Sequence, residues 1–340
     1  MSSNASCFTC NCRFGRITEA TALMKFLLVK TSSLGDVIHN LPVASDIRRA
    51  LPQADIDWVV EESFAEIPRM HPAVRRVLPV AVRRWRKSLL SATNWREILA
   101  YRRAVRAEHY DAIIDTQGLA KSALLAAQAR GKKFGHAHPR EALATLGYHV
   151  VIDIARNQNA VLRNRQLAAD ALGYALDDLP LDYGIVAAPL NTDWLPANKY
   201  AVLLTATSRA DKEWPETDWI ALGKALADLG LTSVLPGGSA AERERATRIA
   251  GALQGAIAAP AMNLTDLSGL LAGARVIIGV DTGLVHLAAA LGRPTVAIYC
   301  ASEPDLTGVL ADTPHANLGA YGKPPTAASV ITASLQLLGG

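Results

Sequence analysis

No apolar run in this sequence reaches the roughly 18 residues that a membrane-spanning helix needs. The stretch 264–278, for example, is interrupted by Asp266, Gly269, Gly273 and Arg275. A protein that crosses a membrane is therefore not expected. Of the 340 residues, 50% are hydrophobic and only 19% are charged, a balance that favours large buried cores and two domains of ordinary size.

Cysteine is also scarce, and its placement excludes a disulfide framework. Three of the four cysteines lie in the first twelve residues, and the fourth, Cys300, ends a predicted strand. The first three form a C-x-x-C-x-C run with no second ligand pair downstream, which favours a disordered extension over a metal site. Residues 1–23 lack the apolar core of a secretory signal. We expect the folded chain to begin at Met24 and the protein to be cytoplasmic.

The two common nucleotide-binding motifs, G-x-G-x-x-G and G-x-x-x-x-G-K-[ST], are missing, which disfavours a dehydrogenase or an ATPase. There is also no Asp-x-Asp pair at the end of a strand, because Asp55 and Asp57 stand where a strand begins. We therefore expect neither a metal ion nor a cofactor. The net charge of +4 does not indicate a nucleic-acid partner, but it is compatible with a polyanionic ligand or an anionic membrane surface.

Apolar strands alternate with longer amphipathic segments in two series, which predicts an α/β protein with parallel sheets. The first series has strands near 25–30, 55–60 and 110–118 and helical segments over 36–52 and 119–131. The second has strands near 200–208, 232–238, 275–281 and 294–299 and helices over 216–230, 240–253 and 284–291.

Pro, Asp and Asn are frequent between residues 177 and 199, as in a linker, and we place the domain boundary near Leu181. The predicted domains are 24–180 and 181–318, followed by a final helix within 319–340. In open α/β sheets, ligands bind outside the carboxyl ends of the strands. Two such domains in tandem therefore predict a shared cleft.

The stretch "GVDTGLVH" places Asp281, Thr282, Gly283 and His286 where a strand passes into a helix. The glycine allows close approach of a ligand, and the helix offers unpaired amides that suit phosphate. Asp281 suits a sugar hydroxyl better, or it caps the helix. A cap explains the aspartate and glycine without any ligand, but it does not explain the histidine, so we favour the phosphate site.

Two further strand ends in the second half carry polar side chains. Thr207, Ser208 and Lys212 follow one strand, and hydroxyls with a lysine bind phosphate oxygens well. Glu242 follows a glycine pair after another strand and could accept from ribose hydroxyls. Taken singly, each of these segments is equally compatible with an ordinary solvated loop or helix surface.

In the first half, "KTSSLGDVIHNLP" supplies Ser33, Gly35, Asp36 and His39 after the first strand. Asp36 opens a helix whose dipole keeps its carboxylate ionised, and an ionised acid at a cleft can act as a general base. A simple helix cap is the alternative. The density of hydroxyl and imidazole groups favours the catalytic interpretation.

A basic run surrounds Trp85, and such a run is commonly a solvated face, although it could receive carboxylates or phosphates. Its members are Arg83, Arg84, Arg86 and Lys87. Gln117, Lys121 and Arg140 lie after another strand end or in a loop and are uninformative singly.

Together, "KTSSLGDVIHNLP", "ATSRADKEWPE" and "GVDTGLVHLAAALGRPTVAIY" resemble the heptosyltransferase I family of Gram-negative bacteria, from Met24 to about Leu338. The resemblance implies a GT-B fold, in which two Rossmann-like domains face a central cleft and the last helix packs back on the first domain. It implies an inverting, metal-independent transfer of L-glycero-D-manno-heptose from ADP-heptose to the Kdo of Kdo-lipid A. Such an enzyme would work at the cytoplasmic face of the inner membrane, in peripheral contact with its anionic surface.

The resemblance also implies residue roles. Asp36 matches the catalytic base, and Met262 falls where the family packs against adenine. Glu242 matches the ribose contact. The remaining donor residues by this match are Thr207, Ser208, Lys212, Asp281, Thr282, Gly283 and His286. The acceptor residues are Ser33, Gly35, His39, Arg83, Arg84, Gln117, Lys121 and Arg140.

Two alternatives stay open. A heptosyltransferase II-type enzyme would add the next heptose to a neutral heptose acceptor, for which Arg83 and Arg84 are less necessary. A non-catalytic nucleotide-sugar-binding protein would not need Asp36 beside the donor cluster.

Overall fold

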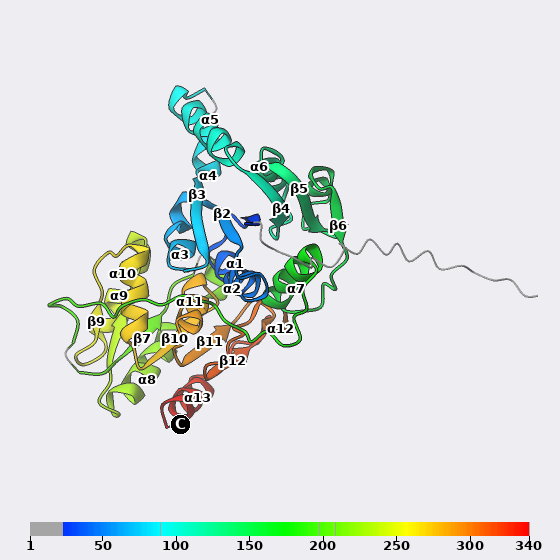
Figure 1. The fold of residues 1–340 in the computed structure, drawn as a ribbon. Helices are drawn as coiled ribbons and strands as arrows, with labels where there is room; N and C mark the ends of the chain where they lie inside the picture. Colours follow the sequence, from blue (N-terminus) through cyan, green and yellow to red (C-terminus); the bar gives the residue numbers. More distant parts are fainter. Residues whose placement is uncertain (1–22, 89, 197, 208, 340) are drawn as a thin grey trace, which may run out of the picture.

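The computed structural model describes residues 23–88, 90–196, 198–207 and 209–339. The predicted extension, with Cys7, Cys10 and Cys12, lies outside the described residues except for Leu23. The chain forms two six-stranded sheets whose strand pairs are all parallel, one above the other in Figure 1. This confirms the α/β prediction.

The first sheet has the order β3-β2-β1-β4-β5-β6. Its strands are β1 (Lys25–Val29), β2 (Asp55–Glu61), β3 (Val74–Val80), β4 (His109–Asp115), β5 (Arg130–His136) and β6 (Val150–Ile152). The helices are α1 (Leu34–Ile38), α2 (Leu41–Ala50), η1 (Glu62–Phe64), α3 (Glu66–Arg69), α4 (Val82–Trp85), α5 (Ala92–Arg106), α6 (Ala120–Ala127), η2 (Ala142–Gly147) and α7 (Ala160–Leu172).

The second sheet has the order β12-β11-β10-β7-β8-β9, which repeats the first arrangement in the second half of the chain. Its strands are β7 (Tyr200–Leu204), β8 (Thr232–Leu235), β9 (Ile257–Ala258), β10 (Val276–Val280), β11 (Thr295–Tyr299) and β12 (His315–Gly319). The helices are η3 (Ala210–Lys212), α8 (Glu216–Ala227), α9 (Ala240–Gly251), α10 (Leu264–Gly273), α11 (Gly283–Ala290), α12 (Pro304–Thr307) and α13 (Ala327–Gly339).

This strand order gives each sheet a switch point, between β1 and β4 in the first and between β7 and β10 in the second. Loops that leave adjacent strands in opposite directions open a crevice at the carboxyl edge, where ligands bind. The segments singled out in the sequence follow β1, β7 and β10, so they meet at these crevices.

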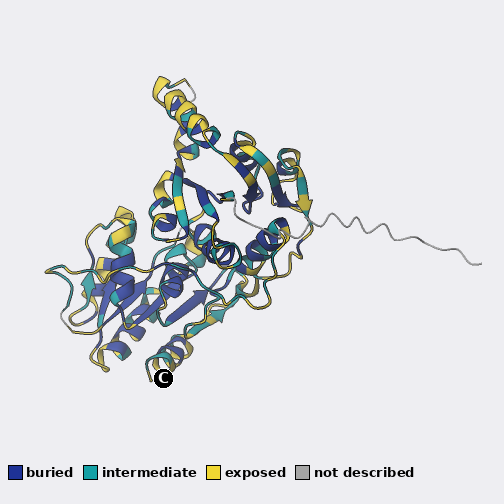
Figure 2. Ribbon diagram, viewed as in Figure 1, coloured by how far each residue is buried: buried dark blue, intermediate teal, exposed yellow. Residues whose placement is uncertain are grey.

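The apolar cores explain how the two domains hold together. One cluster joins α1, α2 and α7 of the first domain to α10 and α11 of the second. A second cluster lies between the second sheet and α8, α9 and α13, and a third lies between the first sheet and α4, α5 and α6. Figure 2 shows the buried residues running from one sheet into the other through the contact layer.

Two sequence expectations were wrong. The segment 36–52 is not one helix, because the chain breaks after Ile38 and restarts with Pro42 in the first turn of α2, where a proline is tolerated. The last helix does not return to the first domain. α13 buries Val330 and Ala333 against α8 and the second sheet, so its apolar face is already covered there.

Candidate functional site

Asp36 lies in the first turn of α1, directly after the loop that follows β1. Its carboxylate accepts hydrogen bonds from the backbone N–H (2.9 Å) and the hydroxyl (3.1 Å) of Ser33, the residue that caps the helix. Asp36 is therefore not the N-cap residue considered as an alternative, but as the N3 residue it takes part in the capping box of α1. This role does not remove Asp36 from the cleft, because the side chain stays 14% exposed and lines the cavity there.

Two cations set the charge of Asp36. The Arg140 guanidinium lies 3.2 Å from its Oδ1, and Lys30 is buried nearby in the first domain. Burial alone would raise the pKa of Asp36, but the charges of Lys30 and Arg140 and the Ser33 hydrogen bond hold it below its ordinary value. The carboxylate is therefore ionised at neutral pH, as a general base must be.

Sequence reasoning missed Lys30. Its ammonium group donates to the carbonyl of Thr116 (2.8 Å), and burial lowers its pKa to about 8. The available signal was a lysine placed directly after the apolar run 26–29 of β1, at the same sheet edge as the Asp36 loop. A buried lysine requires a compensating partner, and here the nearby carboxylate of Asp36 favours its charged form.

Gln117 and Lys121 hold the loop before α1. The Gln117 side chain accepts from the backbone N–H groups of Thr31 (2.9 Å) and Ser32 (3.1 Å) and donates to the Ser32 carbonyl (2.5 Å). Lys121 donates to the Ser32 hydroxyl (2.8 Å). Both side chains were predicted to contact the acceptor, which stays untested, and the structure shows them bonded to the loop before α1.

In the second domain, Asp281 directly follows β10 and organises the donor side of the cleft. Its carboxylate accepts from Lys212 (2.5 Å) and from Ser302 (2.6 Å), and His286 Nε2 lies 3.9 Å away. Burial would raise the pKa of Asp281, but the neighbouring His286 and the hydrogen bonds from Lys212 and Ser302 hold it well below the ordinary value. The residue that caps α11 is Thr282, so the capping alternative for Asp281 was wrong.

The two domains meet through the first turns of α1 and α11. His39 Nε2 lies 3.1 Å from His286 Nδ1, with the two rings at right angles, and both histidines are buried. Burial, followed by the neighbouring His286, lowers the pKa of His39 well below its ordinary value. A Cβ added at Gly283 would lie 2.7 Å from Leu34 Cβ, so this close approach requires glycine there.

A cavity of about 440 Å³ lies between the domains. From the first domain it is lined by Ser33, Gly35, Asp36, His39, Arg83 and Arg140, and from the second by Thr207, Lys212, Asp281, Thr282, Gly283 and His286. The structure thus gathers most of the predicted acceptor and donor residues around one space. Phe64, which the sequence did not single out, also lines it and stacks 5.7 Å beneath the Arg83 guanidinium.

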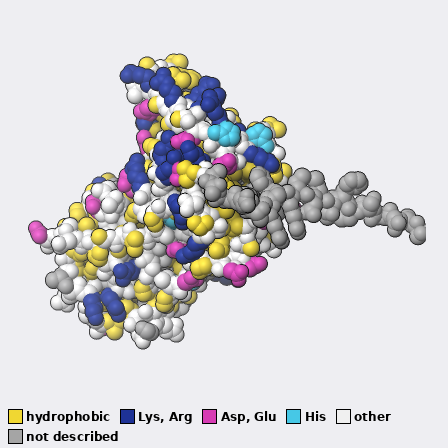
Figure 3. All heavy atoms as spheres, in the orientation of Figure 1, with side chains coloured by type: hydrophobic (Ala, Val, Ile, Leu, Met, Phe, Trp, Pro, Cys, Tyr) yellow, Lys and Arg dark blue, Asp and Glu magenta, His cyan; other side chains and the backbone are white. Residues whose placement is uncertain are grey.

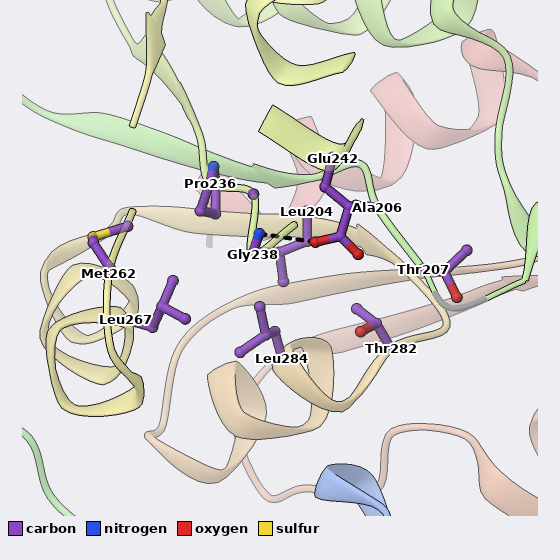
Figure 4. A pocket seen from close by; sticks show the side chains of 11 residues that line it. Leu204, Ala206, Thr207, Pro236, Gly238, Glu242, Met262, Leu267, Thr282 and Leu284 are labelled. Carbon is purple, nitrogen blue, oxygen red and sulfur yellow. Dashed lines mark hydrogen bonds between the residues drawn. The ribbon is translucent and has the colours of Figure 1, made fainter. Parts of the chain in front are cut away.

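A second cavity, of about 250 Å³, opens beside the first within the second domain. Met262, Leu267 and Leu284 form an apolar wall, and Glu242 stands opposite (Figure 4). One oxygen of Glu242 accepts from the backbone N–H groups of Gly238 (2.8 Å) and Ser239 (3.0 Å), which fixes the carboxylate at the start of α9. An apolar wall facing an anchored carboxylate suits a planar base with a hydroxylated sugar.

The two cavities share Thr207 and Thr282. The hydroxyl of Thr207 donates to the Asp281 carbonyl (3.3 Å), which ties the loop after β7 to the loop after β10. The first turn of α11 therefore stands between an apolar slot and the interdomain space. Free amides at this position suit a diphosphate that joins a nucleoside in one cavity to a sugar in the other.

Arg84 does not reach this site. Its guanidinium pairs with Glu62 (3.0 Å) and Glu97 (2.9 Å) and lines a different hollow beside Trp85. The prediction that Arg84 contacts the acceptor stays untested, and the two neighbours on α4 line different cavities. Ser208 lies outside the described residues. Among the residues that are described, no three His, Cys, Asp or Glu side chains gather closely enough to hold a metal ion.

Comparisons with known proteins match most of the chain. Residues 98–333 match the model of glycosyltransferase family 9 (heptosyltransferase). The chain is 47% identical over 288 residues to lipopolysaccharide heptosyltransferase 1 of Escherichia coli K12, covering 84% of this chain and 90% of that protein. The corresponding protein of Pseudomonas aeruginosa is 46% identical over 289 residues, covering 84% of this chain and 81% of that protein.

Solved structures give the same result. The E. coli heptosyltransferase WaaC with ADP superposes with a TM-score of 0.84 at 43% identity, covering 92% of this chain and 100% of that one. The E. coli ADP-heptose heptosyltransferase II superposes with a TM-score of 0.72 at 24% identity, covering 93% and 98%, which shows a shared fold.

Proposed function

Because the chain belongs to glycosyltransferase family 9, the heptosyltransferases, we propose that it transfers L-glycero-D-manno-heptose from ADP-heptose to the Kdo of Kdo-lipid A in lipopolysaccharide core synthesis. The observation that carries the proposal is the interdomain cavity, where an ionised Asp36 faces the Lys212 and Asp281 cluster. Relatives named lipopolysaccharide heptosyltransferase 1 and the solved complex of one heptosyltransferase with ADP support an ADP-linked heptose donor and a place in lipopolysaccharide synthesis.

The donor spans the smaller cavity of the second domain and the interdomain cavity beside it. Adenine stacks on Met262 and Leu267, and the ribose hydroxyls bind Glu242. The diphosphate sits at the first turn of α11, contacting Thr282, Gly283 and Thr207. Lys212 is paired with Asp281 in this structure, so arriving phosphate oxygens compete with that carboxylate for the ammonium group.

The reaction is a single displacement at the anomeric carbon. An acceptor hydroxyl loses its proton to Asp36 as its oxygen bonds to heptose C1, and the bond from C1 to the diphosphate oxygen breaks. ADP leaves with the electron pair, and attack from the opposite face inverts the anomeric centre. Lys212 and the α11 amides stabilise the charge that develops on the leaving diphosphate, a role that needs no metal ion.

The acidic acceptor explains the cations on the other side of the cavity. Arg83, on α4, lines the interdomain cavity beside Phe64. Arg140 lines the same cavity from the segment before η2. The Kdo carboxylate binds between them, which brings one of its sugar hydroxyls toward Asp36. A neutral heptose acceptor would bring no negative charge to this pair of guanidinium groups.

The acceptor is anchored in a membrane, and peripheral contact with the cytoplasmic face of an anionic inner membrane is part of the proposal. The described part of the chain contains no helix of the length and apolarity that crossing a bilayer requires. In this proposal the chain reaches its acceptor from the cytoplasmic surface of the membrane.

The deciding experiment measures ADP release from ADP-heptose with three additions: Kdo-lipid A, the heptosylated product, or neither. Release that depends on Kdo-lipid A supports the proposal. Release only with the heptosylated product would indicate a heptosyltransferase II-type enzyme. Tight ADP-heptose binding without release in any mixture would indicate a non-catalytic nucleotide-sugar-binding protein.

A further inference from the structure

Exposed apolar side chains gather on one face of the first domain. Six of them, 45% to 100% exposed, lie in α5, α6, η2 and the turn before α5, and we call them the α5–α6 surface: Leu90, Trp95, Leu99, Leu124, Leu143 and Leu146. Isolated exposed leucines are ordinary, but several on neighbouring elements indicate an interaction site.

The elements that carry this surface are packed together. α4, α5 and α6 cover the same face of the first sheet, where Trp85, Tyr101 and Leu125 share one buried cluster. The Tyr101 hydroxyl donates to the Leu125 carbonyl (3.1 Å), which joins α5 to α6, and α6 contacts η2. In Figure 1 these helices form the end of the molecule farthest from the second domain.

The charge beside these apolar residues is strongly positive. Residues 82–106 contain eight Lys and Arg residues and one acidic residue, Glu97. Arg84 is paired with Glu62 and Glu97. Arg102 and Arg103 are exposed on α5, one turn after Leu99 and two turns after Trp95. Figure 3 shows Lys and Arg side chains beside hydrophobic ones over this end.

This surface borders the acceptor side of the cavity. Arg83 belongs to α4, at the start of the basic segment, and Arg140 lies two residues before η2. Both line the interdomain cavity, so a lipid-anchored sugar that enters between them has its anchor beside the α5–α6 surface.

We infer that the α5–α6 surface docks on an anionic phospholipid bilayer, an assignment that rests on the proposed function. The leucines and the tryptophan enter the boundary between headgroups and acyl chains, where tryptophan is favoured. Arginine side chains around them reach the phosphate groups. The bilayer then holds the open side of the cavity toward the membrane-anchored acceptor.

The test is co-sedimentation of the full chain with vesicles of phosphatidylglycerol and phosphatidylethanolamine, compared with vesicles of phosphatidylcholine. The variant Leu90→Ser, Leu99→Ser, Leu146→Ser should bind the anionic vesicles on the order of tenfold more weakly, because each exposed apolar side chain adds to insertion. Arg102→Glu with Arg103→Glu should weaken binding and reduce its dependence on salt.

The matched control is Val186→Ser, Leu229→Ser, Tyr321→Ser, three exposed residues in the linker and second domain, which should bind as the unmodified chain does. Equal vesicle binding by both triple variants would overturn the assignment. So would a change of oligomeric state in the α5–α6 variant without a change in vesicle binding, which would indicate an interface between copies of the chain.

Assays of heptose transfer distinguish a failure of this inference from a failure of the proposed function. The α5–α6 variant should transfer heptose normally to de-acylated, water-soluble Kdo-lipid A and slowly to the acceptor embedded in vesicles. If the unmodified chain transfers heptose to neither acceptor, the proposed function fails, and vesicle binding still decides the role of the surface. Equal losses with both acceptors would contradict membrane docking.

Discussion

At the scale of single residues, the site depends on carboxylates whose charge is fixed by their neighbours. Asp36 has Lys30 and Arg140 close by, and Asp281 has Lys212 and Ser302. In both cases burial would raise the pKa of the carboxyl group, but the neighbouring groups lower it below its ordinary value. Asp36 faces the acceptor side and is paired with Arg140, whose side chain is 58% exposed, whereas Asp281 is bonded to Lys212, whose side chain is only 19% exposed.

Replacing Asp36 by Asn should slow transfer by about 10²- to 10⁴-fold, the usual contribution of a general base. The amide keeps an oxygen for the Ser33 N–H, so α1 keeps its cap. ADP affinity should stay nearly unchanged, because the donor binds in the other domain. Rates of ADP release and calorimetric ADP titration measure the two effects. A variant with normal turnover would exclude Asp36 as the base.

Lys30 should control the pH dependence of the reaction. Because the folded protein holds the pKa of Asp36 below its ordinary value, the base stays ionised and kcat/KM falls only at low pH, as pH drops through that pKa. Lys30→Met removes a charge that lowers this pKa, so the acid limb should move to higher pH. The profile of kcat/KM against pH measures the shift. If the acid limb of the kcat/KM profile does not move in this variant, Lys30 contributes to packing and does not set the pKa of Asp36.

At the scale of elements, α1 and α11 bring the two half-sites together. Each follows a central strand. Asp36 lies in the first turn of α1 and His39 is its C-cap, whereas Asp281 precedes α11 and His286 lies within it. The histidines then meet across the domain boundary. Gly283 permits this approach, since any side chain there would strike Leu34. Sliding either helix would separate Asp36 from the donor cluster.

A double-mutant cycle should detect the contact between His39 and His286. Single replacements by Ala and the double replacement should give a coupling free energy of about 0.5–3 kcal/mol in stability, the range for residues in contact. Chemical denaturation measures it. The control cycle pairs His39→Ala with Leu229→Ala, an exposed residue of the second domain, and should be additive. Additivity of the two histidines would show that their contact does not couple the domains.

At the scale of the whole molecule, two sheets of the same strand order face one cleft, and each contributes what the other lacks. The first supplies the base and the guanidinium groups, and the second supplies the helix end, the ammonium and the apolar slot. The apolar core continues between the domains, so this arrangement is stabilised by packing as well as by the polar contacts at the cleft.

Transfer should survive chelation, because cations and amides of the chain itself meet the charge on the leaving diphosphate. The rate of ADP release with excess EDTA should equal the rate with added magnesium. A second assay with Lys212→Ala should be much slower in both conditions. Activity lost with EDTA and restored by magnesium would contradict the metal-independent mechanism.

The sequence by itself determined the repeating strand and helix order and the positions of the polar segments after β1, β7 and β10. These follow from local rules, since apolar periodicity and the glycines at strand ends act over a few residues. It could also identify Asp36 and the stretch from Asp281 to His286 as candidates. Resemblance to the heptosyltransferases added residues such as Met262 and Glu242, which have no distinctive local pattern.

Only the tertiary structure decided which of these side chains face the cavity. Arg83 and Arg84 are neighbours in sequence, but the turn of α4 sends one to the cleft and the other to Glu62 and Glu97. Lys30 gains its role from burial near Asp36, and α13 packs where an uncovered apolar face is available on the second sheet. Such outcomes depend on contacts between distant segments, and no pattern of adjacent residues encodes them.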